Sequence, residues 1–332
     1  MTNTFKKIFA VIIAVVMMVG VFTGCGGSAK EDDGKLTVGV IQYISHPSLD
    51  NCYQGVENAL LAKYGDNIVI NRQIGSDASA DADCEAYAKA MVADKVDMII
   101  AIATPAAISA YAATEGTTIP VIFCAVSDPV TPQLVASMDE PGGACSGTSD
   151  VLDLDAQVKM IVSMQPDVKK IGILYTTSEA NSITQLEIFT EICSGYGIEV
   201  IASGVQTAAD VPAAAAALAP QVDCINNFTD NNVVNNLTVV LEAAAEAGIP
   251  VYGSEVEQVK NGCLAAVSID YVALGEVTGE MAVEVLEGAD ISKMAVRTIS
   301  EATPVVNSEV LAELNIPLPT EYEGAEMVTT NK

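Results

Sequence analysis

A stretch of this chain occurs twice in related form, and the duplication constrains the fold more than any other feature of the sequence. The first copy spans residues 96–130 and the second begins at Val222. In each copy an apolar run follows Val-Asp, a Thr-Pro or Thr-Asp turn leads into helix formers, and Ile-Pro-Val opens a second apolar run. This order of strand, loop, helix and strand is typical of parallel sheets covered on both faces. Two copies predict an α/β fold of two similar, doubly wound parallel-sheet lobes.

The length of the chain also favours two lobes. Its 332 residues exceed what one hydrophobic core usually holds, and a hydrophobic fraction of 50% with 17% charged residues is typical of a globular protein. Several predicted crossings between the lobes imply a multi-strand hinge with a cleft above it. The predicted division is lobe I at residues 36–148 and 272–303, lobe II at 149–271 and 304–322, and a tail at 323–332.

The first residues have the pattern of an export signal. Lys6 and Lys7 precede an apolar run over residues 8–22, which is short for a membrane span of about 20 residues. The run ends in Phe22-Thr23-Gly24-Cys25, which resembles the lipobox of bacterial lipoproteins, whose cysteine carries the lipid. We therefore predict a signal peptide at residues 1–24, a flexible tether at 25–35 and a lipid on Cys25. The alternative is a buried or membrane-spanning segment in which Cys25 is incidental. The expected location is outside the cytoplasm, anchored to the cell membrane.

Charge and cysteine content exclude several partners. Without the leader, 13 basic and 43 acidic residues give a formal charge of −30, which would repel phosphate backbones, so we expect no nucleic-acid partner. The seven remaining cysteines cannot all pair and none forms Cys-x-x-Cys, while a single histidine cannot complete a familiar zinc set. We expect no metal and no cofactor, and we expect most of these cysteines to be buried filler.

Loops that lead from strands into helices are predicted to hold an anion. The segments at residues 104–107 and 178–182 are such loops, at matching places in the two lobes. Helix N-termini leave N–H donors free and carry partial positive charge. We expect Thr104 and Ser178 to hold a ligand carboxylate there, the alternative being ordinary helix capping.

Acidic and aromatic residues at the same rim complete the predicted site. A buried carboxylate facing a cleft requires a cation such as an α-ammonium group, and Asp230 and Asp270 are the first candidates, with Glu255 next. Aromatic rings at strand ends, such as Tyr43, could stack on a planar ligand, although core packing is an alternative. The predicted ligand-binding residues are Gln42, Tyr43, His46, Thr104, Ser127, Asp128, Ser178, Asn181, Phe228, Thr229, Asp230, Asn231, Glu255, Asp270 and Tyr271.

Catalysis finds little support in the sequence. There is no Gly-x-Ser-x-Gly elbow, no Walker motif and no complete dinucleotide fingerprint. One enzymatic alternative is a cofactor-independent racemase that uses Cys124 with Cys224 or Cys263 as paired acid and base. The apolar context of these thiols disfavours the thiolate, so we expect a protein that is not an enzyme.

Eight short segments together resemble a known family. They are Gly39-Val-Ile-Gln42, His46-Pro-Ser-Leu-Asp50, Ala103-Thr-Pro-Ala-Ala107, Ser127-Asp-Pro-Val130, Pro141-Gly-Gly143, Ser178-Glu-Ala-Asn-Ser182, Thr229-Asp-Asn231 and Gly275-Glu-Val-Thr-Gly-Glu-Met-Ala282. The combination resembles the substrate-binding lipoproteins of the ABC importer group with tryptophan- and tyrosine-binding members. The resemblance implies a type I periplasmic-binding-protein fold, an aromatic amino acid as ligand, and a membrane permease with its ATPase subunit as partners. A nucleoside or sugar ligand, or a sensor that transports nothing, stays open.

Overall fold

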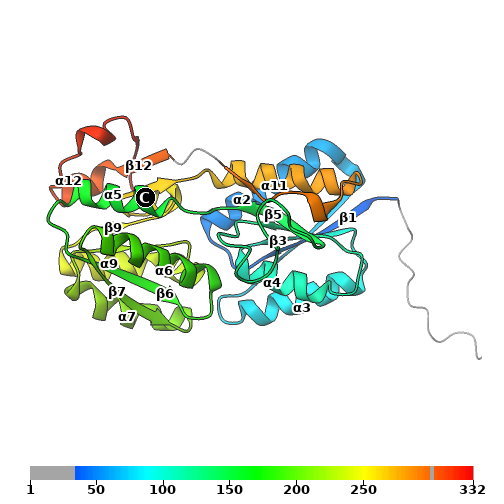
Figure 1. Ribbon diagram of the computed structural model, residues 1–332, viewed down its shortest axis with the longest axis horizontal. Helices are drawn as coiled ribbons and strands as arrows, with labels where there is room; N and C mark the ends of the chain where they lie inside the picture. Colours follow the sequence, from blue (N-terminus) through cyan, green and yellow to red (C-terminus); the bar gives the residue numbers. More distant parts are fainter. Residues whose placement is uncertain (1–33, 300–302, 332) are drawn as a thin grey trace, which may run out of the picture. The chain divides into compact units, whose positions relative to one another are not determined.

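A computed structural model describes residues 34–299 and 303–331 of the chain (Figure 1). The predicted signal peptide, Cys25 and most of the tether lie outside these residues. Among the described residues, no helix combines the length and the apolar character that a membrane crossing requires.

Lobe I is built on a six-stranded sheet in which every pairing is parallel. In spatial order the strands are β11 (Arg297–Thr298), β5 (Cys145–Ser149), β4 (Val121–Cys124), β3 (Met98–Ile102), β1 (Leu36–Gln42) and β2 (Ile68–Ile74). The central strands β3 and β4 are buried along their whole length, which explains their uninterrupted apolar sequences.

Two pairs of helices cover the two faces of this sheet (Figure 1). They are α2 (Pro47–Tyr64) with α11 (Tyr271–Leu286), and α3 (Ala80–Ala93) with α4 (Thr104–Ala113). The short helices η1 (Gly65–Asn67) and η4 (Ile291–Lys293) also belong to this lobe. The strand, helix and strand expected within residues 96–130 are present as β3, α4 and β4.

Glycine brings α2 and α11 into backbone contact. A Cβ atom on Gly55 would lie 2.1 Å from the carbonyl oxygen of Val272, and one on Gly275 would lie 2.1 Å from that of Cys52. No side chain fits at such distances, so the approach requires glycine at both positions. The contact fixes the N-terminal ends of both helices, which carry site residues.

Lobe II contains two smaller sheets. The strands β7 (Glu199–Val205), β6 (Lys170–Thr176), β8 (Cys224–Asn226) and β9 (Val251–Tyr252) form a parallel sheet in that order. The strands β10 (Ala265–Ser268), β12 (Thr303–Asn307) and β13 (Glu326–Val328) form the other, with β10 antiparallel to β12. The Leu264 amide donates to the carbonyl of Val251 at 2.7 Å, which joins the two sheets.

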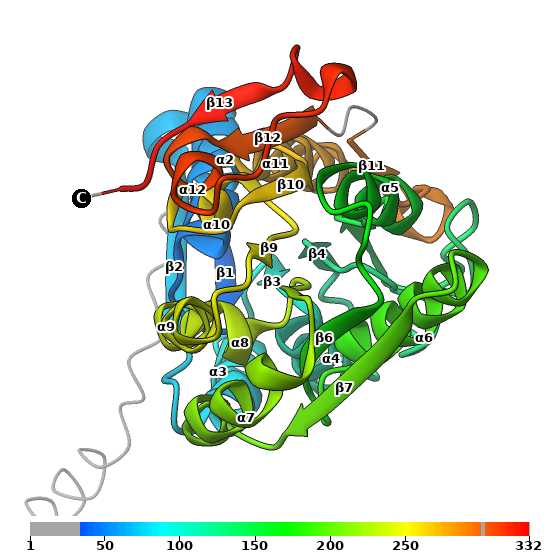
Figure 2. The same cartoon turned by 90° about the vertical axis from the view of Figure 1, so that its left-hand side faces the viewer.

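The helices of lobe II surround these sheets (Figure 2). They are α5 (Leu154–Met164), α6 (Ala180–Gly195), α7 (Val211–Leu218), α8 (Asn231–Asn235), α9 (Leu237–Ala247), α10 (Val256–Lys260) and α12 (Ser308–Glu313), with η2 (Ala208–Asp210), η3 (Ala219–Gln221) and η5 (Thr320–Tyr322). Figure 2 shows β13 beside β12, so residues 323–332, expected as a tail, contribute a strand. Helix α6 begins at Ala180 and its N-cap is Glu179.

The chain passes between the lobes after β5, after β10 and between β11 and β12. This arrangement of two α/β lobes with repeated crossings confirms the predicted fold class. It brings the carboxyl ends of β1, β3 and β4 toward the loops that follow β6, β8 and β9, where the site lies.

Candidate functional site

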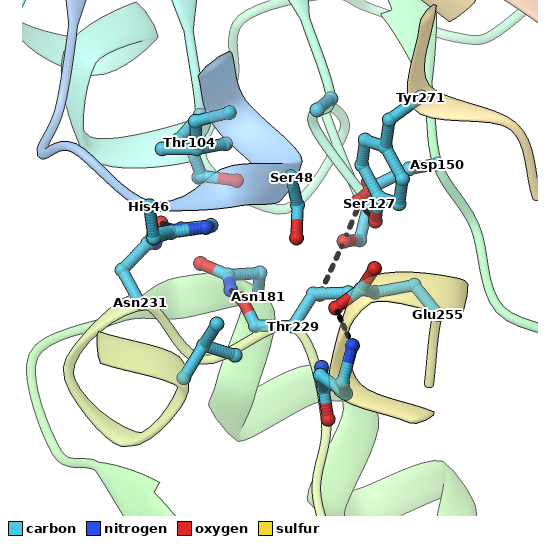
Figure 3. A pocket seen from close by; sticks show the side chains of 15 residues that line it. His46, Ser48, Thr104, Ser127, Asp150, Asn181, Thr229, Asn231, Glu255 and Tyr271 are labelled. Carbon is cyan, nitrogen blue, oxygen red and sulfur yellow. Dashed lines mark hydrogen bonds between the residues drawn. The ribbon is translucent and has the colours of Figure 1, made fainter. Parts of the chain in front are cut away.

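Side chains from both lobes line one pocket (Figure 3). About 360 Å³ of space lies between these side chains, open solvent at the mouth included. His46 Nε2 lies 3.3 Å from Asn231 Oδ1, and Ser127 Oγ lies 3.3 Å from Thr229 Oγ1, so hydrogen bonds join the lobes across it. The lining residues are His46, Ser48, Leu49, Ala103, Thr104, Ala125, Ser127, Asp150, Asn181, Thr229, Asn231, Val234, Glu255, Gln258 and Tyr271.

Two helices begin at the wall of the pocket. The N-cap residues of α2 and α4 are His46 and Ala103, and neither side chain makes a capping hydrogen bond. The first-turn N–H groups of both helices are therefore not satisfied by these side chains and can serve an anion. Ala103 has a positive φ of 81°, which is rare for alanine. Such a strained backbone persists only where the surrounding structure imposes it.

Two buried carboxylates stand on the opposite side of the pocket from His46 and Thr104 (Figure 3). Asp150 accepts hydrogen bonds from Ser127 Oγ and Tyr271 OH, both at 2.8 Å. Glu255 accepts from the N–H groups of Glu257 and Gln258 as the N-cap of α10.

Burial sets the protonation of both acids. It raises the pKa of Asp150 above its ordinary value, and it raises the pKa of Glu255 to about 7, each against hydrogen bonds that lower it. None of the residues that line the pocket is lysine or arginine. A bound cation would supply the positive partner that these carboxylates do not find among the pocket residues.

Polar neutral groups form the other side. His46 is buried, and burial lowers its pKa to about 4, so the ring is neutral at physiological pH. Its Nδ1 atom has no hydrogen-bond partner, and neither has the side-chain oxygen of Asn181 or of Gln258. Buried polar atoms without partners are uncommon in folded proteins, and at a pocket wall they indicate places for ligand atoms.

Eight of the predicted residues line this pocket, drawn from loops of both lobes. They are His46, Thr104, Ser127, Asn181, Thr229, Asn231, Glu255 and Tyr271.

The two acids predicted first for the ammonium group lie outside the pocket lining and serve as helix caps. Asp230 is fully buried and accepts from Thr176, Ser182 and the Val233 amide. Asp270 is exposed and caps α11 through the amides of Val272 and Ala273. Glu255 is also a helix cap, but unlike these two acids it lines the pocket.

The remaining predicted residues also lie elsewhere. Phe228 packs edge-on against Phe189 in the core of lobe II, with ring centroids 5.4 Å apart. Gln42 accepts from Arg72 Nη2 at 2.5 Å, and Tyr43 is buried in the lobe I core. Ser178 is exposed in a groove beside α3 and α4, and Asp128 is half-buried and accepts from the amide of Val130 at 3.0 Å.

Asp150 is the main residue that the sequence reasoning missed. It follows β5, whose sequence Cys-Ser-Gly-Thr-Ser is small and polar although the strand is fully buried. Its position directly after a strand, where the chain leaves lobe I, is the signal that could have identified it. Ser48 and Gln258 were also missed, each within three residues of a predicted one.

The cysteines lie away from the pocket. All seven described cysteines are buried and unpaired, and none lines the pocket. Burial raises the pKa of the Cys224 and Cys263 thiols well above the ordinary range. Among the described residues, no group of three histidine, cysteine or acidic side chains could hold a metal ion.

Fold and pocket together define a two-lobed α/β ligand-binding protein, and the sequence places it in a family. The chain matches the ABC transporter substrate-binding proteins over residues 37–323 and belongs to that family.

Two relatives that bind aromatic amino acids are similar to this chain over most of their length. A tyrosine-binding protein from Clostridioides difficile (strain R20291) is 38% identical over 324 residues, which cover 94% of this chain and 93% of the relative. The structure of an ABC domain in complex with L-Trp from Streptococcus pneumonia is 32% identical, with a TM-score of 0.84 over 89% of this chain and all of that one.

A third relative differs in its state. The ligand-free, open structure of a substrate-binding protein with adhesive properties from Clostridium difficile is 35% identical, with a TM-score of 0.67 over 89% of this chain and all of that one. The similarity of structure is thus higher with the L-Trp complex, although the identities are close.

Proposed function

We propose that this substrate-binding protein takes an aromatic amino acid in its zwitterionic form. The observation that carries the proposal is the buried Asp150 carboxylate, which has no cation, placed across one pocket from the open N-termini of α2 and α4. Positive and negative groups on one small ligand would satisfy both sides. The tyrosine-binding and L-Trp-bound relatives support an aromatic side chain.

The carboxylate of the ligand would rest on the first-turn N–H groups of α2 and α4. Ser48 and Thr104 line the pocket there and add hydroxyl donors. The ammonium group would pair with Asp150, with Glu255 beside it. Tyr271 replaces Phe228 and Tyr43 as the aromatic residue of the site, because it alone of the three lines the pocket.

The biological setting follows from the family and from the leader sequence. The protein would carry its ligand to a membrane permease driven by an ATPase subunit, outside the cytoplasm, anchored by a lipid on Cys25. It would perform no chemistry, and closure of the lobes on the ligand would be the signal that the permease reads.

The chain contains no tryptophan, which gives a direct test. L-Tryptophan added to the protein should show emission shifted to the blue as its ring leaves water, without a protein tryptophan background. Calorimetry should give 1:1 binding of L-tyrosine or L-tryptophan. Binding of a nucleoside or sugar, with no response to any aromatic amino acid, would replace the proposed ligand class.

A further inference from the structure

Glu179 is a buried carboxylate that does not line the pocket but touches two residues that do. It is the N-cap of α6 and is 1% exposed. Its Oε2 atom accepts from the backbone N–H of Asn231 at 3.2 Å and from the side-chain Nδ2 of Asn231 at 2.7 Å. Asn181 Nδ2 lies 3.5 Å from the same oxygen and 3.3 Å from the carbonyl of Thr229.

These contacts fix which way both amides face. The backbone N–H of Asn231 can only donate, so Glu179 Oε2 accepts from it, and an Oε2 atom that carries no proton can only accept. Each amide therefore turns its NH₂ group toward Glu179. The two side-chain oxygens, Oδ1 of Asn231 and Oδ1 of Asn181, must face away from it.

The orientation of Asn231 in turn fixes the ring of His46. Asn231 Oδ1 can only accept, so His46 Nε2 at 3.3 Å must carry the proton. The neutral ring then has a bare lone pair on Nδ1, which is buried and has no partner. Asn181 Oδ1 is also buried without a partner. The wall near His46 thus offers two acceptors and needs donors to satisfy them.

We infer that Glu179 is a positioning residue that holds His46 Nδ1 and Asn181 Oδ1 as acceptors toward the pocket, so that the site selects ligands with a second N–H or O–H donor. The inference rests on the proposed function. There the ammonium group of the ligand pairs with Asp150 and Glu255 on the opposite side of the pocket (Figure 3). The remaining donor of an aromatic amino acid is the phenol of tyrosine or the indole N–H of tryptophan. Phenylalanine has none.

The raised pKa of Glu179 explains how an acid can be buried at this position. Burial, together with the negative charge of Asp230, raises the pKa of Glu179 to about 8. Tyr43 also lies close enough for its pKa to be raised by Glu179, after burial. The amides keep this orientation as long as Oε2 itself carries no proton.

One test reads the ring of His46 directly. His46 is the only histidine of the chain, so protein labelled with ¹⁵N at histidine alone, without a histidine tag, gives a single imidazole. Long-range ¹H–¹⁵N spectra should show the Nε2–H tautomer in the wild type and in Glu179→Gln, whose carbonyl oxygen can replace Oε2. Glu179→Leu should give a mixture of tautomers, and Glu191→Leu, an exposed position on the same helix, should not. An Nδ1–H tautomer in the wild type would overturn the inference.

The second test measures selectivity. L-Phenylalanine should bind at least about 100-fold more weakly than L-tyrosine, because it leaves buried acceptors unpaired. The ratio should be kept in Glu179→Gln and Glu191→Leu and should fall below about tenfold in Glu179→Leu. Equal binding of L-phenylalanine and L-tyrosine by the wild type would refute the selectivity, even if Glu179→Leu does not fold. If no amino acid binds, the proposed function fails, whereas the tautomer measurement still tests the role of Glu179.

Discussion

Asp150→Asn should weaken ligand binding while it stabilises the ligand-free protein. Asp150 is 2% exposed. Its Oδ1 accepts a hydrogen bond from the Ser127 hydroxyl, and its Oδ2 accepts one from the Tyr271 hydroxyl. Loss of one partner from a buried, hydrogen-bonded charge pair costs roughly 2–5 kcal/mol, so affinity should fall about 30- to 4,000-fold. In the ligand-free protein the same substitution removes an uncompensated buried charge, so the free energy of unfolding should rise.

The pH dependence of stability has a definite sign. Burial raises the pKa of Asp150 in the folded state, so between the ordinary value of 3.8 and the folded value the native protein holds more protons than the unfolded chain. The Asp150 contribution therefore makes stability fall as pH rises through this window, and above it the full cost is present. Asparagine removes that contribution.

Calorimetry with L-tyrosine and urea unfolding at pH 4 and pH 7 would measure both effects. Asp153→Asn is a matched control, because Asp153 is the N-cap of α5 and does not line the pocket. It should lose about 1 kcal/mol of stability at most and keep its affinity. Wild-type affinity in Asp150→Asn would refute the assignment of the ammonium site, and an unchanged stability at pH 7 would refute the cost of the buried charge.

Three further predictions concern the surroundings of the site. Glu179→Gln should be more stable than the wild type at pH 8 by up to roughly 5 kcal/mol but not at pH 4, because folding raises the Glu179 pKa from 4.5 to about 8, and urea unfolding at the two pH values should show this. Gly275→Ala should lower the unfolding free energy by about 1–3 kcal/mol or more, because the added Cβ meets the Cys52 carbonyl. Gly195→Ala has open space around it and should raise the unfolding free energy by about 0.4–1 kcal/mol. The reverse order of stability in urea unfolding would contradict the packing argument. Tyr271→Phe should weaken L-tyrosine binding about tenfold through the lost hydrogen bond to Asp150; unchanged affinity by calorimetry would show that this hydroxyl is not needed.

The sequence predicted the elements of the fold well because their signals are local. Continuous apolar runs such as Met98–Ile102 and Val121–Cys124 lie in the centre of the sheet, as expected for strands buried on both faces. The strand at Glu326–Val328 was missed because three residues carry no periodicity, and only pairing with β12 makes them a strand.

The structure brings the predicted loops together at one pocket but separates the predicted carboxylates. His46, Thr104 and Asn231 line one pocket because loops after parallel strands converge on one edge of a sheet. The sequence could not distinguish Asp150 from Asp230, since each follows an apolar or small-residue strand.

The amino-acid sequence alone determined the two-lobed α/β fold and the set of loops that face the cleft, because hydrophobic periodicity and duplication are properties of neighbouring residues. Only the tertiary structure decided which side chains meet there. Asp230 accepts hydrogen bonds from Thr176 and Ser182 away from the pocket, whereas Asp150 lines the pocket. The Glu179, Asn231 and His46 contacts join three separate segments across two lobes, so their orientation depends on how the lobes pack and not on any local pattern.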